Sequence, residues 1–275
     1  MDENLLIFDS HAHYTDSAFD TDREALLEKL PQEGVMHCIV CGTQLADSAA
    51  AAALAERYPS LLSAAVGVHP ECPAPPDGYS EQLRKMAAHP CVRAIGEIGL
   101  DYHYEGYDKA VQQRILREQL ALAQALSLPV ILHCREATGD MLTILREFAP
   151  LSGVMHCFSG SVETAREVLQ MGLYLGFNGV ITFKNARKPL EVIRFAPTDR
   201  LLLETDCPYL APVPFRGRRC DSTMIAETAA VMAREKGISR AEICRITAQN
   251  AIRLFRCEKV CADPAEIISA GIPES

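Results

Sequence analysis

Short apolar runs alternate with stretches of helical periodicity along almost the whole chain. We interpret the apolar runs as eight strands, at 5–8, 35–42, 61–70, 92–101, 129–134, 153–159, 173–179 and 201–206. The helical stretches fall at 21–30, 46–57, 80–88, 108–126, 139–148, 161–171, 187–195 and 222–236, with a last one at 239–255. Near-continuous apolar strands are typical of a parallel sheet covered by helices. Eight such units predict an α/β fold, a (β/α)8 TIM barrel rather than an open sheet.

The length of the chain agrees with this fold. The 275 residues match a single barrel, which usually needs about 250 residues. No linker rich in Pro, Gly or Ser interrupts the middle of the chain. We therefore predict one (β/α)8 barrel domain over 1–256, followed by an irregular C-terminal tail over 257–275.

Charge and cysteine content narrow the class of function. The net charge is -9, which argues against a broad electrostatic grip on duplex DNA or on a membrane surface. No stretch approaches the roughly 20 apolar residues of a membrane span, and we expect no signal peptide. The 11 cysteines then indicate reduced thiols and a cytoplasmic location. Cys38 and Cys41 are expected to be small buried residues, because no second CxxC accompanies them.

Polar residues stand near the carboxyl ends of five of the predicted strands. His11 and His13 follow the first strand, two residues apart, so that an extended backbone would aim both imidazoles the same way. The others are Glu97 in AIGEIGLD, His133 in VILHC, His156 in VMHCF and Asp206 in LLLETD. A single polar residue of this kind is usually a satisfied core residue. Closure of a barrel, however, would bring all six to one small ring of strand ends.

This set of side chains predicts a metal centre. Four imidazoles and two carboxylates are enough ligands for two divalent ions, with Glu97 bridging them. We expect His11, His13, Glu97 and Asp206 around one ion, and Glu97, His133 and His156 around the other. Such a pair would hold a hydroxide nucleophile, and Asp206 would accept the proton of that water. The ions would be Mg, Mn or Zn. Cys134, Cys157 and Cys207 are expected to point toward the helices and not to be ligands.

The motifs also resemble a known family. DSHAHY, GVHPE, AIGEIGLDYHY, HCFSGS, VITFKNA, LLLETDCPYLAPVPFRGRR and TAQNAIRLF together resemble the TatD-type metal-dependent deoxyribonucleases over about 5–256. The resemblance implies an amidohydrolase-type barrel that cleaves DNA phosphodiesters, commonly as a 3′–5′ exonuclease on single-stranded or frayed ends. The ligands it implies are the same six: His11, His13, Glu97, His133, His156 and Asp206. Together with Asp206 and Glu97, Glu204 is implied in catalysis as a residue that orients water or a ligand.

The resemblance also suggests residues on the substrate side. Candidate phosphate contacts are His69, Arg135, Lys184 and Arg216. Candidate stacking residues for a terminal base are Tyr102, Tyr104 and Phe158, with packing at the barrel rim as the alternative. Arg218 and Arg219 are expected to be solvated loop charges. The chain departs from the family at Cys220-Asp221-Ser222, where an Asn-Glu/Gln-Pro run is common, and this departure bears on substrate grip.

Two other classes of function stay open at this point. One is a metal hydrolase of a small cyclic amide, lactone or phosphate ester, since this type of barrel hosts all of these. The other is a non-catalytic barrel that binds a protein or RNA partner, against which the complete ligand set argues. We expect DNA as the substrate, no membrane association, and a monomer.

Overall fold

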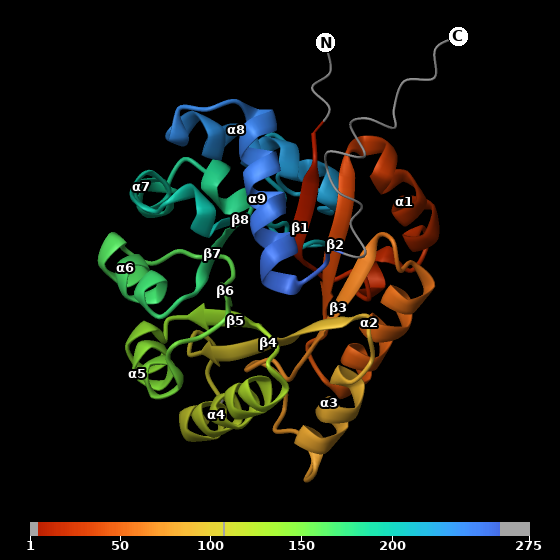
Figure 1. Ribbon diagram of the computed structural model, residues 1–275, viewed down its shortest axis with the longest axis vertical. Coiled ribbons are helices and arrows are strands. Elements are labelled where there is room, and N and C mark those ends of the chain that lie inside the picture. The colour runs from red at the N-terminus through yellow and green to blue at the C-terminus, as the bar shows by residue number, and fades with distance from the viewer. Residues whose placement is uncertain (1–4, 107, 259–275) are drawn as a thin grey trace.

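A computed structural model of the chain describes residues 5–106 and 108–258. Within these residues eight parallel strands pair in chain order around one ring. They are β1 (Ile7–Ala12), β2 (Val35–Cys41), β3 (Leu62–Val66), β4 (Val92–Asp101), β5 (Val130–Arg135), β6 (Gly153–Met155), β7 (Tyr174–Phe177) and β8 (Leu201–Leu203). The predicted (β/α)8 barrel is confirmed (Figure 1).

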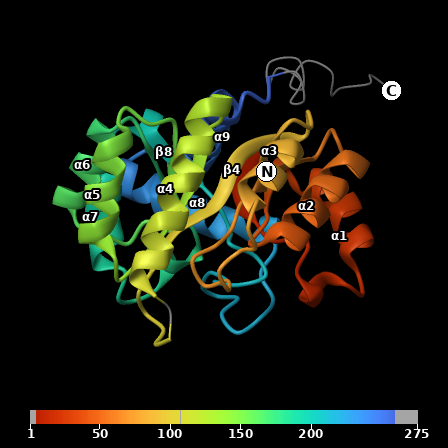
Figure 2. The same ribbon diagram turned by 90° about the horizontal axis from the view of Figure 1, so that it is seen from below.

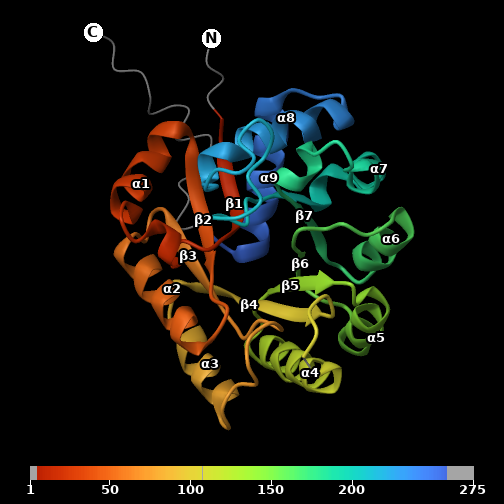
Figure 3. The ribbon, with the colours of Figure 1, turned by 180° about the vertical axis from the view of Figure 1, so that it is seen from behind.

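The helices that connect the strands lie outside the ring, as Figures 1 and 3 show from its two sides. They are α1 (Arg23–Lys29), α2 (Leu45–Arg57), α3 (Tyr79–Ala87), α4 (Lys109–Leu126), α5 (Thr138–Phe148), α6 (Val162–Gln170), α7 (Arg187–Phe195) and α8 (Ile225–Lys236). Apolar residues on their inner faces and on the outward faces of the strands form the main core. This layer of core between sheet and helices is what the near-continuous apolar strands require.

The last helix, α9 (Arg240–Phe255), closes one end of the barrel. Its buried residues pack in one cluster with the inward-facing residues Phe8, Ala94 and Ile131. These three lie near the amino ends of their strands, and the ring of Phe255 stacks on that of Phe8 with the centroids 6.1 Å apart. Figure 2 shows α9 on one side of the ring and the loops after β4 and β8 on the other. The carboxyl ends of the strands are therefore left for a site.

At the junction between β8 and β1, which we call the seam, the barrel is not closed by a regular ladder of backbone hydrogen bonds. The ladders run from β1 to β8, and β1 meets the segment after β8 through a single parallel bridge between Ala12 and Cys207. Side chains add to this closure, since the Ser10 hydroxyl donates to the Leu203 carbonyl over 3.1 Å. The sequence predicted that β1 ends at residue 8, and this is wrong: it continues, fully buried, to Ala12. Its polar residues do not end the strand because they find partners across the seam.

Four strands end two or more residues earlier than predicted, among them β3 at Val66 and β7 at Phe177. The runs 153–159 and 201–206 contain β6 and β8, which end at Met155 and Leu203. Cys157 and Asp206 have φ angles of 45° and 64°, a left-handed conformation that a strand does not contain. His156 and Asp206 therefore lie in the turns that follow these strands rather than inside them.

The predicted tail falls almost entirely outside the described residues. Cys257 and Glu258 are described, and Cys257 is buried beside Phe255 in the cluster under the barrel. In the part of the chain that the structure describes, no helix is both long and apolar enough to cross a membrane.

Candidate metal centre

The six predicted ligands come together at the carboxyl end of the barrel. His11 lies in β1 and His13 directly after it, and their Nε2 atoms are 3.0 Å apart. Asp206, in the turn after β8, places Oδ1 3.5 Å from Nε2 of His11 and 3.3 Å from Nε2 of His13. These three residues form the first ligand group, and it spans the seam.

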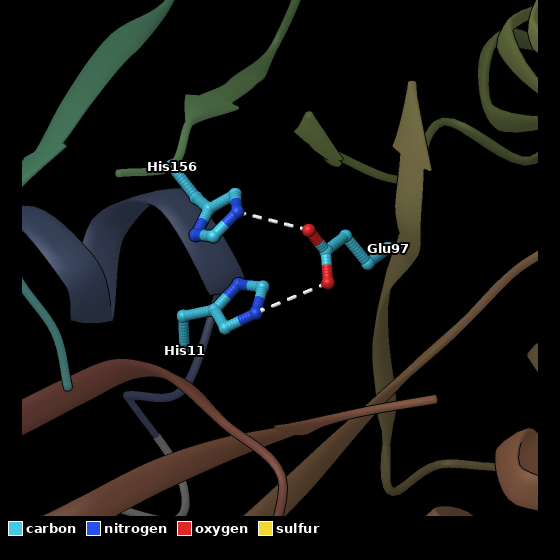
Figure 4. Close-up of side chains that lie close together, drawn as sticks. All are labelled: His11, Glu97 and His156. Atoms are coloured by element: carbon cyan, nitrogen blue, oxygen red, sulfur yellow. Dashed lines mark ion pairs between the residues drawn. The ribbon is translucent and has the colours of Figure 1, made fainter. Parts of the chain in front are cut away.

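Glu97 of β4 lies between this group and a second one. Its Oε2 is 3.3 Å from His11 Nε2, whereas its Oε1 is 2.9 Å from His156 Nε2 and 3.1 Å from His133 Nδ1. Figure 4 shows the carboxylate between His11 and His156, with one oxygen toward each ring. We call His133 and His156 the second ligand group. One buried carboxylate thus presents a separate oxygen to each of two sets of imidazoles.

Local backbone features allow this approach. Asp9 pairs with Cys38 and Ala12 with Val40, so β1 holds one more residue than β2 beside the first group. Bulges of this kind re-aim side chains next to active sites. On the other side, a Cβ atom at Gly99 would lie 1.9 Å from the His133 carbonyl oxygen. Glycine at this position lets β4 and β5 bring their ligands together.

Two of the imidazoles are oriented by acceptors behind them. His13 Nδ1 lies 3.0 Å from the Cys41 carbonyl oxygen, and His133 Nε2 lies 2.9 Å from Asp101 Oδ2. An acceptor can only be matched by an N–H, so the proton stays on these nitrogens and the opposite ring nitrogens turn lone pairs to the centre. The sequence reasoning missed Asp101, although its position as the last residue of β4 was a usable signal.

His69 and Glu71, from the loop after β3, both lie beside the candidate ligands. His69 was a candidate phosphate contact, and its Nε2 is 3.5 Å from Glu97 Oε1. It therefore joins Glu97 and His133 in a group whose ligand atoms lie within 4.8 Å of one another. Glu71 forms a similar group with Asp101 and His133. Glu71 was missed, although it stands two residues after His69 in GVHPE.

Glu204 occupies a different place from Asp206. Glu204 stands two residues before Asp206, so a continuous strand would put both carboxylates on one face, but β8 ends at Leu203, before both. Glu204 is buried behind His156: its Oε1 accepts from the Cys157 N–H over 2.6 Å and lies 3.4 Å from His156 Nδ1. A Cβ atom at Gly176 would lie 2.3 Å from Glu204 Oε2, so this glycine makes room for the carboxylate. Glu204 therefore contacts the second ligand group and not the first.

The charges of the centre suit a cation. Burial opposes ionisation of Glu97, but the surrounding imidazoles, led by His156, hold its pKa well below the usual range. Burial lowers the pKa of His13, whereas Asp206 and Glu97 outweigh it and raise that pKa to about 9. Carboxylates stay ionised here, and a divalent ion can replace the imidazole protons. Mixed imidazole and carboxylate ligands fit Zn or Mn and, with their oxygens, Mg.

The cysteines that follow three of the ligands were predicted not to bind metal. Among the described residues, none of the four clusters of candidate ligand atoms includes a cysteine. Cys207 packs in the main core, and burial raises the pKa of the Cys134 thiol to about 11.

The predicted substrate residues lie at or after the carboxyl ends of strands β3 to β8. Arg135 lies over the ring of Tyr104, which is 49% exposed, and Arg216 lies over Phe183. Lys184 is exposed. Phe158 is buried, and the Tyr102 hydroxyl donates to Asp140. Arg219 was predicted to be a solvated charge, and this is wrong: it makes a two-point ion pair with Asp22, which a planar guanidinium favours.

Comparison with known proteins agrees with this geometry. The sequence profile described as "TatD related DNase" matches residues 8–256, nearly the whole barrel. The chain belongs to the TatD-related DNase family. It is thereby a member of a family of metal-dependent hydrolases and nucleases, as the motifs indicated.

Individual relatives cover almost the whole of this TatD-family chain. The metal-dependent hydrolase YabD of Bacillus subtilis is 43% identical over 256 residues, which are 91% of this chain and 99% of that protein. A Cronobacter sakazakii protein named 3′-5′ ssDNA/RNA exonuclease TatD is 38% identical over 260 residues, covering 90% and 97%. The crystal structure of the Escherichia coli TatD homologue YjjV superposes with a TM-score of 0.86 at 35% identity, over 92% and 99% of the two chains.

Proposed function

We propose that the centre would hold two divalent ions, with one oxygen of Glu97 available to each ligand group, and that the protein hydrolyses phosphodiester bonds in DNA. The observation that supports two ions is the Glu97 carboxylate, whose oxygens face separate ligand groups. His11, His13 and Asp206 would complete one site, and His133 and His156 the other. His69 is near enough to Glu97 Oε1 to serve the second site as well. A single barrel domain over 1–256 carries this chemistry.

The hydrolytic step needs an activated water and a proton acceptor. A bound pair of divalent ions lowers the pKa of a bound water and neutralises phosphate charge. Asp206 is the only one of the six that is partly exposed and also ends in a carboxylate, with 17% of its side chain accessible, so it is our candidate to accept the proton of that water. Glu204 supports His156 from behind and is proposed to act through it.

The substrate is proposed to be a single-stranded or frayed 3′ DNA end. Relatives named as 3′-5′ ssDNA/RNA exonucleases support this. A cavity of about 430 Å³ lies beside His156, and Arg135, Phe158, Ser161 and Lys188 are among its lining residues. Two cations, an aromatic ring and a hydroxyl suit a terminal nucleotide with its phosphate. RNA ends and small esters are the alternative substrates. The monomeric state is a prediction that gel filtration checks.

Cleavage of an end-labelled single-stranded oligonucleotide tests the proposal. Chelator-stripped wild type, Glu97→Ala and Asp206→Ala are each supplied with Mg, Mn or Zn. The exposed Glu28→Gln on α1 is the matched control. We expect a ladder from the 3′ end that both site variants lose and the control keeps. Wild-type protein that holds two ions by elemental analysis, yet cleaves no oligonucleotide, would overturn the nuclease and favour a small ester or cyclic amide as substrate.

A further inference from the structure

Asp9 of β1 is a buried carboxylate with an unusual complement of donors. It has no accessible surface, and burial raises its pKa to about 7. Its Oδ1 accepts from the backbone N–H groups of His11 over 3.2 Å and Thr205 over 3.0 Å. Its Oδ2 accepts from the hydroxyls of Thr205 and Ser222, each over 2.6 Å. All four donors are neutral groups, so the carboxylate is satisfied by geometry and not by a counter-charge.

These donors come from segments that are far apart in the chain. Thr205 lies in the turn after β8, and Ser222 begins the short 3-10 helix Ser222–Met224 that precedes α8. The Ser222 hydroxyl also lies 2.6 Å from the Tyr14 hydroxyl. We call Asp9, Tyr14, Thr205 and Ser222 the seam network. It joins the two sides of the barrel where the backbone supplies only one bridge.

The seam network also holds the turn that carries Asp206. Asp206 has a left-handed φ of 64°, a conformation that a non-glycine residue keeps only when its surroundings impose it. The Thr205 hydroxyl accepts from the Cys207 N–H over 3.1 Å, and the Asp206 N–H donates to the His11 carbonyl over 2.9 Å. Asp9 thus fixes Thr205, and Thr205 fixes the backbone on both sides of Asp206.

We propose that Asp9, through Thr205 and Ser222, is a positioning residue that sets the spacing of the His11–His13–Asp206 ligand group. The inference rests on the proposed metal centre and adds to it the origin of the geometry of one site. It also gives the departure at Cys220-Asp221-Ser222 a different meaning. Ser222 has no accessible surface, so it does not touch substrate and instead completes the seam network.

The second ligand group has separate supports. Asp101 orients His133, and Glu204 stands behind His156. Neither belongs to the seam network. A fault in that network should therefore weaken the ion held by the first group and spare the other. A merely structural role would lower stability without this selectivity.

Mn²⁺ titration of the chelator-stripped full-length protein tests the proposal, followed by electron paramagnetic resonance and checked by elemental analysis. His11→Ala and His133→Ala assign the two binding steps to the two groups. Thr205→Val removes the hydroxyl with little change in shape, whereas Thr205→Ser keeps it. We expect Thr205→Val and Ser222→Ala to raise the Kd of the first group's ion tenfold or more and that of the other less than twofold. Thr205→Ser should stay near wild type.

Ser63→Ala is the control, because that buried hydroxyl bonds His37 away from the centre. Equal weakening of both ions by Thr205→Val, or wild-type affinities in both Thr205→Val and Asp9→Asn, would overturn the positioning role. Wild-type protein that binds no Mn²⁺ at all would instead overturn the metal centre, and the positioning role with it. The two failures are therefore distinguishable.

Discussion

At the scale of single residues, the centre depends on buried carboxylates. Their burial costs free energy, and specific partners offset this cost. An ionised carboxylate inside a protein is unfavourable unless it is paired or hydrogen-bonded. The burial of Glu97 is offset by imidazoles, and that of Asp101 by His133 together with the His103 N–H. The neutral donors of Asp9 offset its burial only in part, since its pKa is still raised to about 7. The partners of each carboxylate therefore give it a different role, and none of these roles follows from residue type alone.

Asp101 should matter because it contacts His133 Nε2, whereas His133 Nδ1 is the ring nitrogen near Glu97. Asp101→Ala removes the acceptor that keeps the proton on Nε2 of His133, so the ring loses its fixed orientation. Loss of such an outer partner typically weakens metal affinity or activity about 10–100-fold. Metal titration and oligonucleotide cleavage measure the effect. Asp140→Ala, which removes an exposed carboxylate on α5 nearby, should leave both within about twofold.

His37 makes stability depend on pH independently of the site. Burial lowers its pKa from 6.5 to about 4, so the folded chain is less ready than the unfolded chain to bind a proton there. As the pH falls from 6.5 to about 4, unfolding is favoured, by roughly 3 kcal/mol in total. Urea unfolding at a series of pH values should show this loss in wild type and its absence in His37→Gln. Parallel curves for the two proteins would contradict the assignment.

At the scale of elements, the two ends of the barrel have separate tasks. The amino end is filled by large apolar side chains and closed by α9, which makes it a source of stability. The carboxyl end carries short strands, turns with left-handed residues and the ligand groups. This division is typical of (β/α)8 enzymes, where the strand-to-helix loops carry the chemistry and the opposite end the stability.

Phe255 of α9 tests this division. Its ring is 1% exposed and stacks on Phe8. Phe255→Ala should lower the free energy of unfolding by about 3–5 kcal/mol, because a cavity opens under the barrel. Phe195→Ala, on α7 and 40% exposed, should cost less than about 1 kcal/mol. Urea unfolding gives both values, and metal affinity of the folded protein should not change in either variant.

At the scale of the whole molecule, the chain is acidic but carries a few positively charged side chains beside the candidate metal centre. A net charge of -9 repels nucleic acid at long range, so recognition should depend on short-range contacts near the centre. Arg135 and Lys188 line the cavity beside His156. On the proposed nuclease function, we expect such a surface to bind a strand end in preference to a continuous duplex.

Lys188 and its neighbour offer a matched pair of variants. Lys188→Ala should raise the KM for a single-stranded oligonucleotide about tenfold with kcat within twofold, because it would remove the proposed phosphate contact without touching the reacting atoms. Arg187→Ala removes an equal charge that pairs with Glu191 instead, and it should leave KM nearly unchanged. Steady-state kinetics at one fixed salt concentration compares the two. Equal effects of both variants would show that the KM depends on the overall positive charge of the protein and not on a contact in the cavity.

The amino-acid sequence by itself determined the alternation of strands and helices, and with it the barrel. It also placed six candidate ligands together, because parallel βα units bring the carboxyl ends of all strands to one edge. Both predictions depend on the local periodicity of apolar and polar residues, which is visible in a single sequence. The extents of β4 and α7 agree with the predicted ranges for the same reason.

Only the tertiary structure decided which polar residues are partners. The carboxylate of Asp9 meets the hydroxyls of Thr205 and Ser222, which are 196 and 213 positions away in the chain. The tertiary structure also separated Glu204 from Asp206, because the left-handed backbone at Asp206 ends the alternation of side chains along the strand. Bonds across the seam leave no trace in local periodicity. They exist only because the barrel closes, and closure is a property of the whole chain.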